Sequence, residues 1–226
     1  GIIGGMSWES SVEYYRIINE EVKNRLGGLR SAKIILFSVD FAEIEILQHE
    51  GKWAAAGVIM ANAASALERA GADLIIIATN TMHKLANYVT TAVQIPLLHI
   101  ADATAEMVVK TRKTKVGLLG TQYTMEQDFY KGRLIDNYNL EVIVPDLTER
   151  KIIHNIIYDE LCQGIIKEES KANYVRMIKN LMDAGAQAVI LGCTEIELLI
   201  KPDDCTIPLF PTAKIHALAA VDYVLN

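Results

Sequence analysis

Two segments of the chain, one in each half, carry nearly the same pattern. The first begins at Ala70 and reads AGADLIIIATNT, and the second begins at Ala184 and reads AGAQAVILGCTE. Each combines a helix end, a Gly-Ala turn, an apolar run and a polar tip. A separation of 114 residues, about half of the 226-residue chain, indicates two copies of one folding unit.

Three further pairs of segments lie at nearly the same separation. They are 95–98 with 207–210, 1–5 with 117–121, and Tyr14-Tyr15 with Phe129-Tyr130. One such pair could arise by chance, because apolar strands resemble one another. Four pairs in the same order favour a duplication over two unrelated α/β halves.

Apolar runs typical of buried strands alternate with segments typical of helices. We expect strands at 2–4, 33–39, 74–78, 115–119, 140–144 and 188–191, and helices at 10–26, 53–70, 126–137 and 172–184. Continuous apolar strands between amphipathic helices predict parallel sheets that are covered on both faces. The expected fold is therefore α/β, with two pseudo-symmetric, doubly wound parallel-sheet domains.

The boundary between the two expected domains follows from the repeat. If the strand at Ile207-Pro208 ends the second copy, the helix at 213–225 crosses back to cover the first domain. The first domain then comprises 1–98 plus 209–226, and the second comprises 99–208.

Composition excludes several classes of protein. The chain carries 22 Lys and Arg against 28 Asp and Glu, a net charge of −6 without a basic stripe, which argues against nucleic-acid binding. No apolar run is long enough to span a membrane, and no signal peptide is recognisable at the start. Three scattered cysteines, Cys162, Cys193 and Cys205, predict neither a disulfide framework nor a metal site, and they favour a reducing compartment such as the cytoplasm.

The candidate site lies at the polar tips of the two repeated strands, because ligands bind beyond the carboxyl ends of parallel strands. The tips are Thr79-Asn80-Thr81 and Cys193-Thr194-Glu195. A two-fold relation between the domains is expected to bring the tips together across an interdomain cleft. Asn80, Thr81 and Thr194 are good helix-capping residues, and free backbone amides beside them favour a carboxylate. A thiol in such a place is expected to have a pKa below the free value of about 8.5.

Two opposed side chains that flank one carbon favour proton removal on one face and proton delivery on the other. That chemistry is racemisation without a cofactor, in which fixed donors stabilise an enolate-like charge in a water-poor cleft. The chain has no phosphate-binding loop and no convincing dinucleotide fingerprint, so no cofactor is expected.

Four stretches of the chain together resemble one known family. They are 1–10 (GIIGGMSWES), 38–45 (SVDFAEIE), 80–83 (NTMH) and 191–195 (LGCTE), and they are similar to the aspartate/glutamate racemase family. The resemblance runs over nearly the whole chain. It implies a cofactor-independent racemase of acidic amino acids that acts as a homodimer. It also implies an acid/base pair at position 79 and Cys193, with substrate contacts at Asn80, Thr81, Thr194, Glu195 (through its backbone), Met6 and Gln48.

The chain departs from the family pattern at position 79, where Thr stands in place of the usual Cys. A hydroxyl is a far weaker acid than a thiol, so the two faces of the substrate become unequal. By analogy with glutamate racemases, Cys193 is expected to take the proton from the L-enantiomer, and the enzyme is expected to be slow from the D side.

The family also places cationic residues against the substrate's side-chain carboxylate, whereas this chain offers Gln48 and Gln163. Both can donate hydrogen bonds without neutralising a charge. His83, one helical turn after Thr79, is either an auxiliary group that relays a proton or a capping or core histidine. Glu197 is its counterpart in the second copy.

Two other functions fit the same residues. One is a decarboxylase or isomerase of the same superfamily that uses a single cysteine. The other is an amino-acid binder without catalytic activity, which the missing cysteine at position 79 motivates.

Overall fold

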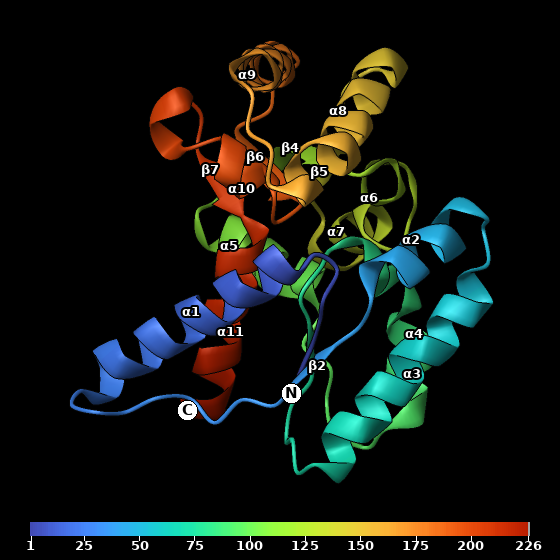
Figure 1. The fold of residues 1–226 in the computed structure, drawn as a ribbon. Helices are drawn as coiled ribbons and strands as arrows, with labels where there is room; N and C mark the ends of the chain where they lie inside the picture. The colour runs from blue at the N-terminus through green and yellow to red at the C-terminus, as the bar shows by residue number, and fades with distance from the viewer. Residues whose placement is uncertain (226) are drawn as a thin grey trace. The chain divides into compact units, whose positions relative to one another are not determined.

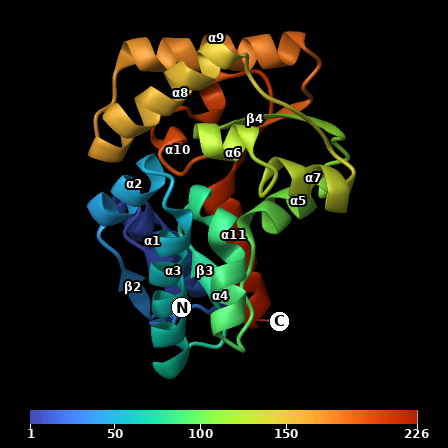
Figure 2. The same cartoon turned by 90° about the vertical axis from the view of Figure 1, so that its right-hand side faces the viewer.

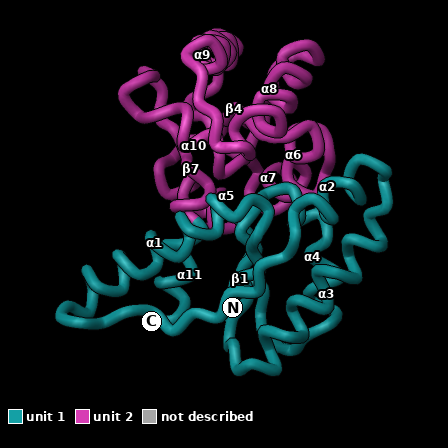
Figure 3. The backbone as a smooth tube through the Cα atoms, viewed as in Figure 1, with its two compact units in different colours: residues 1–100, 216–226 teal, residues 101–215 magenta. Residues whose placement is uncertain are grey.

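The computed structural model describes residues 1–225, and their backbone forms two compact units. The first unit comprises residues 1–100 together with the C-terminal residues from 216, and the second comprises 101–215 (Figure 3). Each unit contains one parallel sheet with helices packed around it (Figures 1 and 2). The α/β fold with two parallel sheets is therefore confirmed.

The first unit has a three-stranded sheet in the order β2-β1-β3. Its elements are β1 (Ile2–Gly4), α1 (Trp8–Leu26), β2 (Leu36–Ser38), α2 (Phe41–His49), α3 (Trp53–Arg69), β3 (Ile76–Ile77), the 3₁₀-helix η1 (Thr81–Leu85) and α4 (Ala86–Ala92). A parallel bridge between Ile75 and Leu97 extends the sheet beyond β3.

The second unit has a four-stranded sheet in the order β5-β4-β6-β7. Its elements are β4 (Lys115–Gly120), α6 (Gln122–Glu126), α7 (Lys131–Tyr138), β5 (Glu141–Ile143), α8 (Leu147–Asp159), η2 (Leu161–Gln163), α9 (Glu168–Asp183), β6 (Ala188–Gly192), α10 (Ile196–Leu199), η3 (Pro202–Asp204) and β7 (Leu209–Pro211). Two helices, α5 (Ile100–Lys110) and α11 (Thr212–Leu225), contain the residues at which the chain passes from one unit to the other.

Strand pairing follows the sequence repeat residue by residue. In the first sheet the pairs are Ile2 with Ile76, Ile3 with Ile77, and Ile75 with Leu97. The corresponding pairs in the second sheet are Leu118 with Ile190, Leu119 with Leu191, and Val189 with Leu209. The two copies therefore share strand order and register as well as sequence, so Thr79 and Cys193 are equivalent positions, two residues after Ile77 and Leu191 respectively.

Two sequence-based boundaries differ from the structure. The strand 209–211, which we expected in the first domain, pairs with β6, because the ladder bonds of its backbone run to Val189–Leu191. The single helix expected at 126–137 is two helices, α6 and α7. The first of them begins earlier because the Thr121 side chain accepts a hydrogen bond from the Thr124 amide and caps it.

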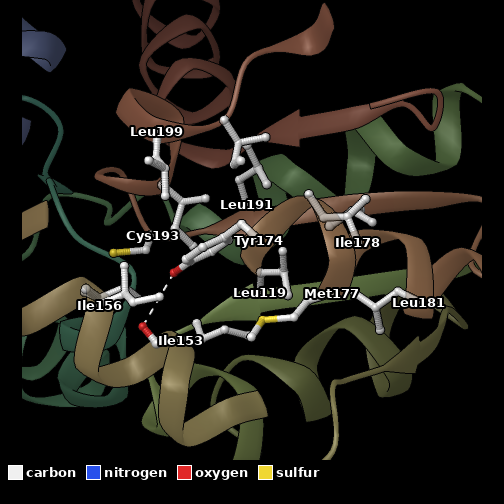
Figure 4. Close-up of a cluster of buried hydrophobic side chains, with 14 of the residues drawn as sticks. Leu119, Ile153, Ile156, Tyr174, Met177, Ile178, Leu181, Leu191, Cys193 and Leu199 are labelled. Carbon is white, nitrogen blue, oxygen red and sulfur yellow. Dashed lines mark hydrogen bonds between the residues drawn. The ribbon is translucent and has the colours of Figure 1, made fainter. Parts of the chain in front are cut away.

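Buried apolar side chains from β4, β6 and the neighbouring helices form a core cluster in the second unit (Figure 4). All five residues of β6 are buried, which explains its uninterrupted apolar sequence. Tyr174 of α9 is fully buried, and its hydroxyl donates to the carbonyl of Ile153 in α8. Cys193 belongs to the same cluster, so the candidate thiol is surrounded by buried apolar side chains.

Within residues 1–225, every helix is too short or too polar to cross a bilayer.

Candidate active site residues

The tip of the second unit begins where β6 ends at Gly192. A side chain at Gly192 would bring its Cβ within 2.7 Å of the Leu119 carbonyl oxygen, and one at Gly120 would come within 2.8 Å of the Gly192 carbonyl. The ends of β4 and β6 therefore approach too closely for any residue but glycine. This close approach fixes the position of Cys193, the next residue along the chain.

Cys193, Thr194 and Glu195 form a compact buried network. The Cys193 thiol donates to Glu195 Oε2 at 2.9 Å, and the Thr194 hydroxyl donates to the same oxygen at 2.8 Å. Cys193 is 8% exposed and Glu195 is 3% exposed. The contact of Glu195 with the other two residues runs through its carboxylate, a role that sequence reasoning, which used only its backbone, did not find.

The expectation of a lowered pKa at Cys193 is wrong. Burial raises the pKa of the Cys193 thiol well above its ordinary value, and the nearby Glu195 carboxylate raises it further by repelling a thiolate and accepting the S–H bond. Cys162 acts in the same direction. At neutral pH the thiol of this network therefore carries its proton.

The expected helix caps are also absent from the second tip. The residue that precedes α10 is Glu195 rather than Thr194, and its side chain makes no capping bond. The amides of Ile196, Glu197 and Leu198 donate to the carbonyls of residues 193 to 195. These amides are thus already bonded within the turn.

In the first unit, the tip residues lie between β3 and η1. Thr79 is half-buried, whereas Asn80 and Thr81 are almost fully buried. Asn80 precedes η1 but forms no side-chain cap, because its backbone is already helical. The Thr79 hydroxyl is therefore the more accessible side chain of this tip.

His83 connects the Thr79 tip to the start of α5. Its Nε2 accepts from the Ile100 amide at 3.2 Å, so its Nδ1 carries the proton and donates to the Thr79 carbonyl at 2.8 Å. Burial and the neighbouring His99 and His216 hold the pKa of His83 well below its usual range. Of the two roles left open, this geometry is that of a neutral capping and core histidine.

Glu197, the counterpart of His83 in the repeat, has the same structural role. Its Oε1 accepts from the Ala213 amide at 3.1 Å, in the first turn of α11. In each copy, the side chain four residues after the candidate acid/base residue accepts a hydrogen bond from a backbone amide near the start of a later helix. His83 does so for α5, and Glu197 does so for α11.

A second buried histidine, His216, was not predicted from the sequence. His216 Nε2 donates to the Leu98 carbonyl at 2.9 Å, and its Nδ1 accepts from the Tyr14 hydroxyl at 2.8 Å. Burial lowers the pKa of His216 to about 4. No local spacing could have revealed this pair, because 202 residues separate its two members.

Three further predicted site residues, Met6, Gln48 and Gln163, make contacts within their own units. Met6 is buried just after β1, and Gln48 is buried in α2, where its Nε2 donates to the Met82 sulfur at 3.0 Å. Gln163 is exposed in η2, and its Nε2 donates to the Tyr158 carbonyl at 3.3 Å.

Two lysines near the predicted substrate-binding segments are paired with carboxylates. Lys52 Nζ lies 2.7 Å from Glu50, and Lys167 Nζ lies 3.1 Å from Glu160. Within residues 1–225, no group of three or more His, Cys, Asp or Glu side chains is arranged to hold a metal ion.

Comparison with known proteins gives one consistent family. The family model of Asp/Glu/hydantoin racemases matches residues 3–220. A crystal structure of a candidate Asp/Glu racemase from Yersinia pestis has a TM-score of 0.93 and 55% identity, and the match covers 100% of this chain and 98% of that one. An aspartate racemase homologue from Pyrococcus horikoshii has a TM-score of 0.85 and 38% identity, with the same coverage. A broad-specificity amino-acid racemase from Bacillus subtilis is 23% identical over 159 residues, which are 70% of this chain and 68% of that protein.

Proposed function

The chain belongs to the Asp/Glu/hydantoin racemase family, and we propose that it is a cofactor-independent racemase of an acidic amino acid, aspartate or glutamate. The observation that carries the proposal is the Cys193 network. A buried thiol donates a hydrogen bond to a buried carboxylate just beyond the end of β6, in a chain whose relatives include amino-acid racemases.

In this proposal Cys193 removes the α-proton of the L-enantiomer, and the Thr79 hydroxyl serves the opposite face of the same carbon. The two groups are unequal, because a thiol loses its proton far more readily than a hydroxyl. The enzyme is therefore biased toward L-substrates and slow from the D side.

Substrate recognition is assigned to polar residues of both tips. We propose that Asn80, Thr81 and Thr194 bind the α-carboxylate, and that Met6 borders the substrate. Gln48 and Gln163 donate hydrogen bonds to the side-chain carboxylate. The family resemblance further favours a homodimer that works in the cytoplasm, and sedimentation of the purified protein tests the dimer.

The experiment that tests the proposal is α-proton exchange in deuterated water with each enantiomer of aspartate and glutamate. Exchange is expected with the L-enantiomers, faster than with the D-enantiomers, and Cys193→Ala is expected to abolish it. Cys205→Ala is the matched control, because Cys205 belongs to the same unit and is not among the groups that shift the pKa of Cys193.

Four results would contradict the proposal or part of it. Exchange that survives in Cys193→Ala removes the catalytic role of the thiol. Equal exchange from both enantiomers removes the bias. Tight amino-acid binding without exchange identifies a binder, and release of CO₂ from a malonate-type substrate identifies a decarboxylase.

A further inference from the structure

The two tips differ in charge, in addition to the difference between Thr79 and Cys193. Glu195 occupies the position in the second copy that Thr81 occupies in the first. The second tip therefore contains a buried carboxylate directly bonded to its thiol, whereas Thr79-Asn80-Thr81 contains no ionisable side chain.

The Glu195 carboxylate is held in position for this contact. Its Oε2 accepts from two side chains at once, the thiol at 2.9 Å and the Thr194 hydroxyl at 2.8 Å. Thr194 and Glu195 are adjacent in the chain and both are buried, so the oxygen has little freedom to turn away from the sulfur.

We propose that Glu195 is the proton partner of Cys193: its carboxylate accepts the thiol proton when substrate binds, and so generates the thiolate that attacks the α-proton. This inference rests on the proposed racemase function for its second step. The coupling of the thiol to the carboxylate, which the first arm of the test measures, is a property of the protein without substrate.

The proposed sequence balances. In the resting pair, the S–H bond of Cys193 breaks and an O–H bond forms on Glu195 Oε2. The thiolate then takes the α-proton, so that an S–H bond forms while the Cα–H electron pair passes into the enolate. After a proton is delivered on the Thr79 side, Glu195 loses its proton to water and the Thr79 side regains one from water.

A proton shared in this way gives the reaction a distinctive pH dependence. The resting pair and the thiolate pair hold the same number of protons, so the thiolate fraction is independent of pH between the two ionisations of the pair. A cysteine without this partner loses its proton to water instead. Its thiolate fraction then rises about tenfold per pH unit below its own pKa.

The first arm of the test is alkylation of Cys193 by iodoacetamide as a function of pH. The parent carries Cys162→Ser and Cys205→Ser, which leave one thiol. Glu195→Gln is expected to move the alkylation midpoint to lower pH, because it removes a negative charge and a proton acceptor from the sulfur. Glu197→Gln is the matched control: it removes a carboxylate from the same tip that bonds Ala213 instead, and its profile is expected to follow the parent.

The second arm is L-substrate α-proton exchange between about pH 6 and about pH 8. The parent is expected to have a flat profile, and Glu195→Gln is expected to rise about tenfold per pH unit until its thiol is ionised. Glu195→Asp restores a carboxylate and is expected to restore part of the flat profile. A purely structural role for Glu195 would lower the rate at every pH and leave the shape unchanged.

Each outcome decides the proposal. Superimposable alkylation profiles of the parent and Glu195→Gln would overturn the proton pair. A second outcome is an alkylation midpoint that shifts in Glu195→Gln together with a parent exchange rate that rises steeply with pH. That outcome would mean that Glu195 only raises the pKa of the thiol by its charge, and it would overturn the proton-transfer step. If no variant exchanges the α-proton, the racemase function fails, while the alkylation arm still decides the pair. Thr194→Val, which removes the second donor to Oε2, replaces Glu195→Gln if urea unfolding shows that the latter does not fold, and its midpoint is expected to shift because the carboxylate is freed to turn.

Discussion

Replacement of His216 by Gln tests whether the first unit depends on a buried neutral histidine. The ring of His216 is fully buried and holds two protein groups, the Leu98 carbonyl and the Tyr14 hydroxyl. Its neutral form satisfies both, because one ring nitrogen donates and the other accepts. A protonated ring would present a second N–H to the Tyr14 oxygen inside a core that contains two other histidines.

The magnitude follows from the pKa of His216, which is about 4 in the folded protein against an ordinary value of 6.5. Because the folded pKa is the lower one, the unfolded chain binds the proton first as the pH falls. The stabilising effect is therefore present above pH 6.5 and is lost as the pH falls from 6.5 toward 4. Integration gives a loss of about 2 kcal/mol between pH 7 and pH 5, and of about 3 kcal/mol below the folded pKa.

The assay is urea unfolding at pH 7 and pH 5, followed by tryptophan fluorescence. Both tryptophans, Trp8 and Trp53, lie in the first unit and therefore report on the part that contains His216. Glutamine does not titrate, so the pH dependence of the unfolding free energy is expected to be smaller in His216→Gln by about 2 kcal/mol over this interval.

Removal of His216 also relieves its lowering effect on the pKa of His83, which reduces the pH dependence of the unfolding free energy in the same direction. A constant offset between parent and variant at the two pH values is the result that would refute the reasoning. It would mean that His216 takes up a proton in the folded state as readily as in the unfolded chain.

Two further predictions concern the two units separately. Thr79→Cys is expected to raise α-proton exchange from the D-enantiomer while changing the L side little, because a thiol is much more acidic than a hydroxyl; deuterium incorporation measures it, and an unchanged D-side rate would contradict the assigned role of position 79. Leu119→Ala is expected to lower the unfolding free energy by about 2–5 kcal/mol, because Leu119 is fully buried in the core of the second unit. Circular dichroism in urea measures this loss, and Leu147→Ala, at a side chain that is 56% exposed, is the control with a loss of at most about 0.5 kcal/mol.

The repeat alone determined much of this fold. Strand and helix periodicities are local, so two apolar runs with the same flanking turns predicted two parallel units of the same design. The shared register of Ile3 with Ile77 and of Leu119 with Leu191 follows from that duplication. The repeat also placed Thr79 and Cys193 at equivalent strand ends. Each residue follows the same Gly-Ala turn by the same number of residues, so each lies at the carboxyl end of its strand.

Tertiary structure alone decided how those residues behave as acids and bases. The sequence predicted an acidic thiol at Cys193, but burial and the turned carboxylate of Glu195 raise its pKa instead. The Tyr14–His216 contact likewise joins two residues that are 202 positions apart in the chain. The pKa of a buried group depends on its desolvation and hydrogen bonds, and therefore on which groups contact it in the folded core. A local sequence pattern specifies helices and strands but does not specify those contacts.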